Sequence, residues 1–243
     1  ATVPMCSQAS PATIASGPAF RATASMPANS STPVAARSLA RRDARRPTVV
    51  GCGVQGEIQL ASLAAVLPLE RAWVLDLDHG RAEAMAARVG ERLGLKVEAA
   101  KDLEVALRQS DVAVTCTTST RSFVTRRMVS PGTFIAAVGA DNRGKQELEP
   151  ELVVEATLVV DVLEQCAEIG ELQHALAARL MAREAVHAEL ADVVSGRRPG
   201  RTRADEITVF DSSGTALEDV AAAVAVYETA RAQGRGTEVA IDE

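Results

Sequence analysis

The sequence contains few aromatic residues: four Phe, one Trp and one Tyr make up 2% of its 243 residues. Its core must therefore be built from Ala, Val, Leu and Ile, which suits helices packed on a parallel sheet buried on both faces. No run of eighteen apolar residues occurs, so the sequence predicts no membrane-spanning helix. The length allows one large domain or one and a half.

Residues that bind metals are also scarce. The four cysteines form no Cys-x-x-Cys pair and the three histidines lie far apart in the sequence, so we predict no metal site. Reduced thiols in a cytoplasmic protein are the expected state. The formal net charge of −6 and the isoelectric point of about 5.3 give no support to nucleic-acid binding.

Residues 1–34 differ in composition from the rest of the chain. Ala, Ser, Thr and Pro dominate this segment, and Arg21 is its only charged residue. Such a segment has little to bury, so we expect it to be disordered, loosely packed or a divergent N-terminal domain, with a transit peptide as an alternative. A basic helix is expected from about Val34 to Arg46, with its arginines on a solvated face.

The most informative motif is the run Gly51-x-Gly53-x-x-Gly56. It follows a β-branched run at 48–50 and precedes apolar residues at helical spacing, which is the setting of a dinucleotide-binding loop. Gly51 allows the tight turn, Gly53 the approach of a pyrophosphate, and Gly56 the close packing of helix on strand. The alternative is a glycine-rich turn in another kind of α/β protein.

Three further residues complete this motif. Val54 and Gln55 begin the predicted helix, whose N-terminal N–H groups and positive dipole end suit phosphates. Asp76 ends the next predicted strand, and its carboxylate is expected to bind the adenosine ribose 2′-OH and to favour NAD over NADP. Arg81 is close enough in sequence to weaken that preference.

Strands and helices alternate along the rest of the chain. The predicted strands are 48–50, 72–76, 96–99, 111–115, 133–138, 157–161 and 206–210. The predicted helices lie near 54–66, 80–93, 102–108, 162–180, 184–195 and 215–233. This alternation predicts βαβ units with right-handed crossovers, and hence a Rossmann-type α/β fold with a doubly wound parallel sheet.

The loops that follow strands should hold the ligand, because parallel strands end at one edge of such a sheet. The candidates in these loops are Thr117, Thr118 and Ser119, then Val138, Gly139, Ala140 and Asp141, and then Ser212 and Gly214. The hydroxyl groups suit ribose or nicotinamide, and the Asp141 carboxylate suits a general base or a partner for a substrate ammonium. Ordinary Ser/Thr turns, an Asx turn and a helix N-cap are the alternatives.

Together these loops resemble the ornithine cyclodeaminase/mu-crystallin family, which also includes archaeal-type alanine dehydrogenases and imine reductases. The resemblance covers about residues 35–240. It rests on motifs in family order: Leu39–Ala44 with the glycine loop, Thr117–Ser119, Val138–Asp141 with Gly144–Leu148, Val159–Asp161 with Gly170–Leu172, and Ile207–Gly214 with Glu218–Ala221.

This resemblance implies an NAD(H)-binding Rossmann domain over 35–205. It also implies a second, reduced domain for substrate and dimerisation, toward which 206–243 would return. Asp141 corresponds to the family's general acid/base, a residue that mu-crystallin lacks. The implied function is an NAD-dependent oxidoreductase acting on a small L-amino acid or its imine, as a homodimer. The alternative is a catalytically impaired NAD(P)-binding protein of the mu-crystallin type.

The chain departs from the family pattern before the glycine loop. Family members carry a longer segment there, which normally supplies a lysine and arginines for the substrate carboxylate. This sequence has no lysine before Lys96. The resemblance therefore implies the cofactor site more fully than the substrate site.

Overall fold

The computed structural model describes residues 31–237 and residue 239. The predicted segment 1–34 therefore lies outside the described residues except for its last positions, where helix α1 (Thr32–Leu39) begins. The segment for which a transit peptide is the alternative, and Cys6 within it, therefore also lie outside them.

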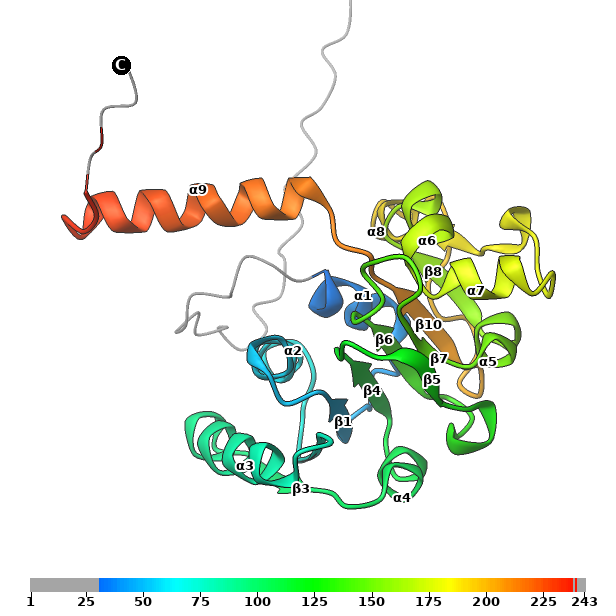
Figure 1. Ribbon diagram of the computed structural model, residues 1–243, viewed down its shortest axis with the longest axis horizontal. Coiled ribbons are helices and arrows are strands. Elements are labelled where there is room, and N and C mark those ends of the chain that lie inside the picture. Colours follow the sequence, from blue (N-terminus) through cyan, green and yellow to red (C-terminus); the bar gives the residue numbers. More distant parts are fainter. Residues whose placement is uncertain (1–30, 238, 240–243) are drawn as a thin grey trace, which may run out of the picture.

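Eight strands form one parallel sheet in the order β3-β2-β1-β4-β6-β10-β8-β9 (Figure 1). These strands are β1 (Pro47–Val50), β2 (Arg71–Leu75), β3 (Lys96–Ala99), β4 (Val112–Thr115), β6 (Phe134–Ala137), β8 (Thr157–Val160), β9 (Ala188–Glu189) and β10 (Thr208–Asp211). The α/β fold with a parallel sheet is thus confirmed. A small second sheet pairs β5 (Thr120–Val124) with β7 (Gln146–Leu148).

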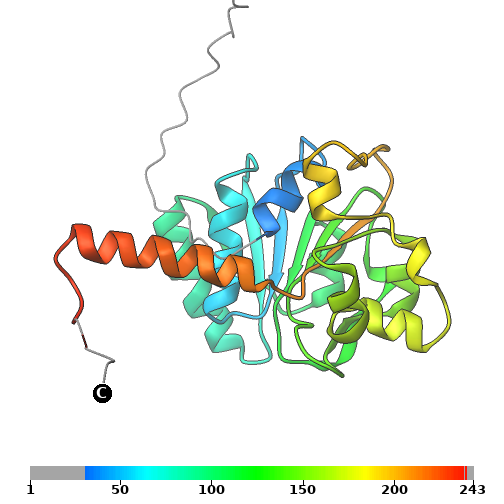
Figure 2. The same cartoon turned by 90° about the horizontal axis from the view of Figure 1, so that it is seen from above.

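Helices pack along the large sheet. Helix α2 (Val54–Ala64) contacts β1 and β4, and α3 (His79–Leu93) contacts β2 and β3. The remaining helices of the body are α4 (Leu103–Arg108), α5 (Pro150–Glu155), α6 (Leu163–Ile169), α7 (Leu172–Ala177) and α8 (Leu190–Val194). Figure 2 shows α2 and α3 toward one end of the sheet and α6 and α7 toward the other.

Helix α3 illustrates how local sequence sets an element's limits. The Asp78 side chain caps its N-terminus by accepting the Gly80 N–H at 3.0 Å, and Gly94 ends it in the left-handed region at φ +61°. Its buried residues, Ala82, Met85, Ala86 and Val89, recur at helical spacing. A cap, an apolar stripe and a C-terminal glycine together explain why this helix lies where the sequence predicts it.

The core is aliphatic, as the composition predicts. Its largest fully buried side chains, apart from Phe134 and Phe210, are Leu, Ile and Met. Strands β1, β4, β6 and β10 are buried along their whole length. Burial on both faces is what a doubly wound parallel sheet requires.

Strand β10 is the last strand in sequence but lies inside the sheet. It pairs with β6 from Thr208 opposite Phe134 to Asp211 opposite Ala137, and with β8 on its other side. Strands β8 and β9 therefore join the rest of the sheet through β10. The division of the chain into domains at residue 206 stays a prediction, and β10 pairs within the sheet of the preceding part.

Three predicted elements differ in the structure. The basic helix expected over 34–46 ends at Leu39, and Arg41 and Arg46 instead reach the carboxylate of Asp111. The helix expected near 162–180 is broken at Gly170 into α6 and α7. The helix expected near 184–195 is only α8, preceded by the short strand β9. Strands β5 and β7 were not predicted.

Helix α9 (Ala216–Ala232) runs away from the body in Figures 1 and 2. Thr215 caps it by accepting the Glu218 N–H, but none of its residues is buried. The apolar residues at helical spacing, Leu217, Val220, Val224 and Tyr227, are all exposed. The helix lies where the sequence predicts it, but its apolar residues point to all sides rather than along one face, and nothing in the described chain covers them.

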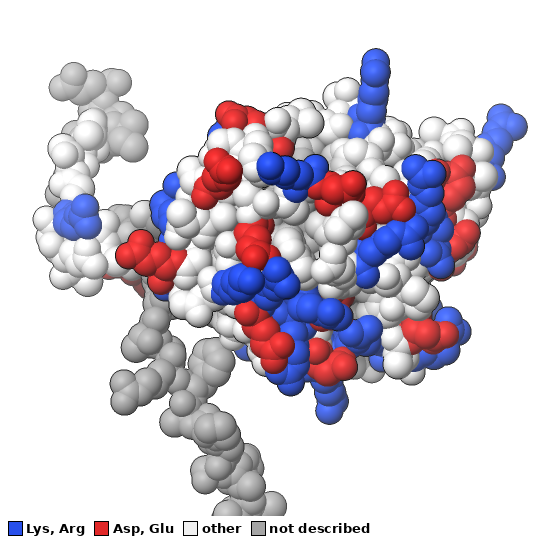
Figure 3. Space-filling model, turned by 90° about the horizontal axis from the view of Figure 1, so that it is seen from below, with Lys and Arg blue, Asp and Glu red and all other residues white. Residues whose placement is uncertain are grey.

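No described helix has the length and apolar character needed to cross a bilayer. Basic and acidic side chains are mixed on the face seen in Figure 3. Charged side chains of the described chain form ion pairs such as Arg71 with Glu98 and Arg126 with Glu155.

Asp111 fastens the segment after α1 to the sheet. Its nearly buried carboxylate accepts hydrogen bonds from Arg41 Nη2 at 2.8 Å, from Arg46 and from the Arg45 N–H. Burial alone would raise the pKa of Asp111, but the hydrogen bonds from the Arg46 side chain and the Arg45 N–H, together with the charges of Arg46 and Arg41, lower it overall.

Asp111→Asn is expected to lower the free energy of unfolding at pH 7 by about 2 kcal/mol, because charged hydrogen bonds are lost. The contribution of the ionised carboxylate is complete above its unfolded pKa of about 4 and disappears as pH falls through the lower folded value. Urea unfolding should therefore show the difference between the two proteins shrinking from pH 5 toward pH 2. The control is Asp43→Asn, an exposed partner of the same Arg41. A difference that stays constant with pH would contradict the assignment.

Candidate dinucleotide and substrate site

The glycine loop joins β1 to α2 with little room for side chains. Gly51 has φ +103° and donates its N–H to Leu75 O at 2.8 Å, and a Cβ on it would lie 2.6 Å from Cys116 O. A Cβ on Gly56 would fall well inside the contact distance of Gly51 O. Gly51 therefore serves the turn, and Gly56 serves the close approach of α2 to β1.

Gly53 has a different environment. It is the N-cap of α2 and carries no side chain to bond the first N–H groups of the helix, and among the described residues a Cβ there would meet only Arg81 Nη2 at 3.8 Å. The next two residues, Val54 and Gln55, are exposed. Within the described part of the chain, the start of α2 thus has N–H groups without a side-chain cap and space beside them, as a bound phosphate would need.

Asp76 lies at the end of β2, beside the glycine loop. Its Oδ2 accepts the Cys52 N–H at 2.9 Å, and its Oδ1 accepts the Asp78 N–H at 3.1 Å. The carboxylate is therefore fixed against the loop, with Arg81 nearby over Gly53. The structure thus brings together the acid and the arginine that the sequence singles out for cofactor discrimination.

The loops after β4 and β6 are joined by a residue that sequence reasoning missed. Glu147, on β7, is fully buried, and its carboxylate accepts the Thr117 N–H at 2.6 Å and the Gly139 N–H at 2.9 Å. Ser119 is held by Gln146, whose N–H it accepts at 2.9 Å. Thr118 is exposed, Val138 half-buried and Ala140 buried.

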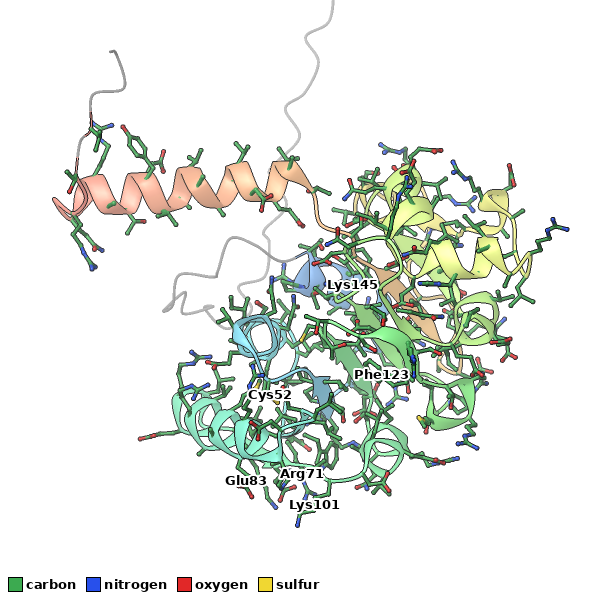
Figure 4. The ribbon with its side chains drawn as sticks, in the orientation of Figure 1. Cys52, Arg71, Glu83, Lys101, Phe123 and Lys145 are labelled. Atoms are coloured by element: carbon green, nitrogen blue, oxygen red, sulfur yellow. The ribbon has the colours of Figure 1, made fainter. Side chains whose placement is uncertain are left out.

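Asp141 follows these residues with its side chain half exposed. Its Oδ1 accepts a bond from Lys145 Nζ at 2.6 Å and one from the Asn142 amide at 3.2 Å. No described residue donates to Oδ2. Lys145, labelled in Figure 4, comes from the same loop between β6 and β7. One oxygen of Asp141 is thus held while the other is available to accept a proton.

The loop after β10 is fixed by Asp161. This carboxylate accepts the Ser213 hydroxyl at 2.7 Å and the Gly214 N–H at 2.8 Å. Ser212 is nearly buried and donates its N–H to Ala137 O at 2.9 Å. The loop therefore lies against the end of β6, close to the loop that bears Asp141.

A cleft of about 400 Å³ lies at this edge of the sheet. It brings together five of the predicted site residues: Gln55, Val138, Asp141, Ser212 and Gly214. Further residues that line it, and that the sequence did not single out for a site, include Gln59, Gln165 and Ile169. Other predicted site residues do not line this cleft but lie on the neighbouring loops. They are the glycines of the first loop, Asp76, residues 117–119, Gly139 and Ala140.

The described cysteines are not suited to nucleophilic chemistry. Burial and the charge of Asp76 raise the pKa of Cys52 to about 12, and burial also raises the pKa of Cys116 and of Cys166. These three thiols therefore stay protonated at neutral pH. Within the described chain, no group of three or more His, Cys, Asp or Glu side chains is arranged to hold a metal ion.

The residues present fit a dinucleotide. In this kind of sheet the pyrophosphate binds at the first glycine turn and the start of the helix that follows it, and here these are the turn that requires Gly51 and the uncapped helix start at Gly53. The adenosine ribose binds at the end of the second strand, where this chain has the carboxylate of Asp76.

Comparison with known proteins agrees with this geometry. The profile of the ornithine cyclodeaminase/mu-crystallin family matches residues 18–234. The chain belongs to this family. The resemblance noted in its motifs is therefore confirmed across most of its length.

Relatives in the family carry related activities. The alanine dehydrogenase of Archaeoglobus fulgidus is 36% identical over 207 residues, which are 85% of this chain and 63% of that protein. The Δ1-pyrroline-2-carboxylate reductase of Thermococcus litoralis, solved with NADH and L-proline, superposes with a TM-score of 0.83 at 33% identity, over 86% of this chain and 65% of that one. An archaeal alanine dehydrogenase dimer with bound NAD gives 0.82 at 35% identity, over 87% and 65%.

The chain thus spans less than two thirds of the length of these relatives. The family includes NAD-dependent amino-acid dehydrogenases and imine reductases, and its structural homologues bind NAD(H).

Proposed function

We propose that this protein is an NAD-dependent oxidoreductase that acts on a small L-amino acid or its imine. The observation that carries the proposal is the cleft in which Asp141 meets the start of α2 at Gln55 and the Ser212–Gly214 loop. A proton acceptor thus stands beside the edge where a dinucleotide fits.

Bound NAD would supply the acceptor for the hydride of the substrate Cα. The glycine loop and the start of α2 would hold its pyrophosphate, and Asp76 its adenosine ribose. Lys145 holds Oδ1 of Asp141, so Oδ2 is the atom that takes a proton from the nucleophile attacking the imine carbon. Water as nucleophile leads to a keto acid and ammonia. A side-chain amine of the substrate instead closes a ring and ammonia leaves; the cyclic imine would then take the hydride back from NADH, so that no net NADH forms.

The experiment is a titration with NADH followed by a panel of amino and imino acids. Binding of NADH and turnover of at least one substrate are expected. NADH accumulating with alanine supports the dehydrogenase route, whereas proline formed from ornithine without net NADH supports ring closure. A chain that binds no NADH contradicts the proposal.

A second candidate is a dinucleotide-binding protein of the mu-crystallin type with impaired catalysis. One observation favours it: among the described residues that line the cleft, none is Lys or Arg, although a substrate carboxylate needs a cationic partner. NADH binding without turnover across the whole panel would select this candidate.

Cofactor preference gives a separate prediction. The wild type is expected to bind NADH more tightly than NADPH by about tenfold, because the Asp76 carboxylate would repel a 2′-phosphate. Asp76→Asn keeps an acceptor for the Cys52 N–H but removes the charge, so NADPH affinity should rise. Fluorescence titration with both cofactors measures this, with Asp78→Asn as the control two residues away. Tighter binding of NADPH by the wild type would overturn the role given to Asp76.

We further propose that the chain acts as a homodimer. The archaeal alanine dehydrogenase is a dimer, and the exposed apolar side chains of α9 offer surface for such contacts. Sedimentation analysis of the purified chain tests this.

A further inference from the structure

Three buried carboxylates form a connected series between β10 and the candidate site. They belong to Asp211 at the end of β10, Glu171 just before α7 and Glu147 on β7, and each residue is at most 1% exposed. In the described part of the chain, no Lys, Arg or His pairs with any of them. Each carboxylate instead accepts two backbone N–H groups, and the hydroxyls of Thr115 and Thr117 beside Glu147 and the thiol of Cys166 beside Asp211 also favour the charged forms.

Asp211 bonds the segment that carries Glu171, and Glu171 bonds the segment that carries Glu147. Asp211 accepts the N–H groups of Glu171 at 3.0 Å and of Leu172 at 2.9 Å. Glu171 accepts those of Glu147 at 2.7 Å and of Leu148 at 3.1 Å. The carboxylates of Asp211 and Glu171 therefore each accept hydrogen bonds from two consecutive residues of one segment.

Glu147, the last member, differs from the other two. Its two N–H donors, Thr117 and Gly139, come from different loops, one after β4 and the other after β6. It therefore fixes the distance between these loops. The second loop continues directly to Asp141, and both loops lie at the edge where the cofactor fits.

Two glycines make room for this arrangement. A Cβ on Gly139 would overlap the Glu147 carboxylate, and one on Gly170 would lie 2.5 Å from Asp211 Oδ2. Gly139 was selected from the sequence as a cofactor residue. The structure gives it a second reason to be glycine, because a larger residue would displace Glu147.

Burying these groups is costly. Burial raises the pKa of Glu147, raises that of Glu171 well above its usual range, and raises that of Asp211 to about 7, despite the N–H donors. An unpaired buried carboxylate opposes folding when it ionises. A pair of apolar contacts could join two loops without this cost, but it could not orient two backbone N–H groups.

From this geometry we infer that Glu147 is a positioning residue, which sets the spacing of the 116–119 and 138–141 loops and thereby the place of Asp141 relative to the dinucleotide. This inference rests on the proposed function for its effect on activity. Its structural part concerns the two loops alone. Neither the oxygen that accepts from Thr117 nor the one that accepts from Gly139 needs to touch substrate or cofactor.

The test compares Glu147→Gln with Glu171→Gln. Both replace an almost fully buried carboxylate that accepts two N–H groups, so both should lower thermal stability, but only the first removes a direct bond to the two loops, whereas Glu171 acts on them through the Glu147 segment. In Glu147→Gln the amide NH2 must face one of the two N–H donors. We expect a rise in the NADH dissociation constant of about tenfold and a fall in kcat of about 100-fold, with a smaller change in the substrate KM. Glu171→Gln should change these values less at the same folded fraction.

Hydrogen exchange resolved to single amides separates this inference from the proposed function. The amides of Thr117 and Gly139 should lose protection in Glu147→Gln and keep it in Glu171→Gln, whether or not NADH binds. Unchanged protection of both amides in Glu147→Gln, or equal losses of kcat in the two variants, would overturn the inference. If Glu147→Gln does not fold, Glu147→Asp takes its place, because it keeps the carboxylate but cannot span both donors. The same outcomes then decide.

Discussion

Replacing Gly56 by Ala is expected to destabilise the whole fold and to abolish NADH binding. The added Cβ would overlap Gly51 O and would lie 3.4 Å from Val49 Cγ1. The first of these neighbours is backbone, and it cannot move freely because Gly51 is confined by φ +103° and by Cys116 O. Helix α2 must therefore shift away from β1, at a cost of about 3 kcal/mol.

Urea unfolding and NADH titration measure the two effects of Gly56→Ala. Gly53→Ala is the matched control, because a Cβ there meets only Arg81 Nη2 at 3.8 Å and the backbone has a φ of −86° that Ala adopts readily. It should leave the free energy of unfolding almost unchanged while weakening NADH binding. Equal stability of the Gly56→Ala variant and the wild type would show that the loop can relax, and the packing role given to Gly56 would then be wrong.

Asp141→Asn is expected to lower kcat by about 10²- to 10⁴-fold, the usual contribution of a general acid or base. The amide has the same shape and its oxygen can still accept from Lys145, but it cannot take a proton. The folded structure and the NADH dissociation constant should therefore change little. Steady-state kinetics with the substrate found in the panel, together with NADH titration, measure both quantities.

Asp205→Asn is a suitable control for Asp141→Asn, because Asp205 is an exposed carboxylate paired with Arg203 outside the cleft. It should keep wild-type kinetics. Full activity in Asp141→Asn would remove Asp141 from the chemistry and leave the mu-crystallin type of function as the better account of the cleft.

The conformations predicted correctly from sequence are those marked by short sequence motifs. The strand–glycine turn–helix order at 48–64 is one of them, while the binding roles of the glycine loop and Asp76 stay predictions. Helix α3 is similar, because Asp78 and Gly94 mark its two ends. Such signals need no knowledge of the rest of the fold.

The features that were missed depend on residues far apart in sequence. In the sequence, Glu147 is one of several charged residues in a polar segment. Its role becomes visible only when the fold brings the N–H group of Thr117, thirty positions earlier, to its carboxylate. The break at Gly170 depends likewise on the carboxylate of Asp211. Hydrophobic periodicity carries no information on such pairings, so a long helix was the natural but wrong prediction for 162–180.

Helix α9 marks another limit of periodicity. The spacing of Val220, Val224 and Tyr227 predicts a helix, but spacing does not say what covers these side chains. In the described chain they face solvent.

The inner position of β10 has a consequence for synthesis on the ribosome. A nascent chain that ends before Thr208 can assemble β3-β2-β1-β4-β6, but β6 and β8 then have no strand between them and keep unpaired edges. The sheet therefore closes only after residues 208–211 have emerged, and the pairing of β10 with β6 joins residues more than seventy positions apart. A chain truncated before Thr208 would expose unpaired strand edges and would therefore be prone to aggregation, so that chaperones would bind it or proteases would degrade it.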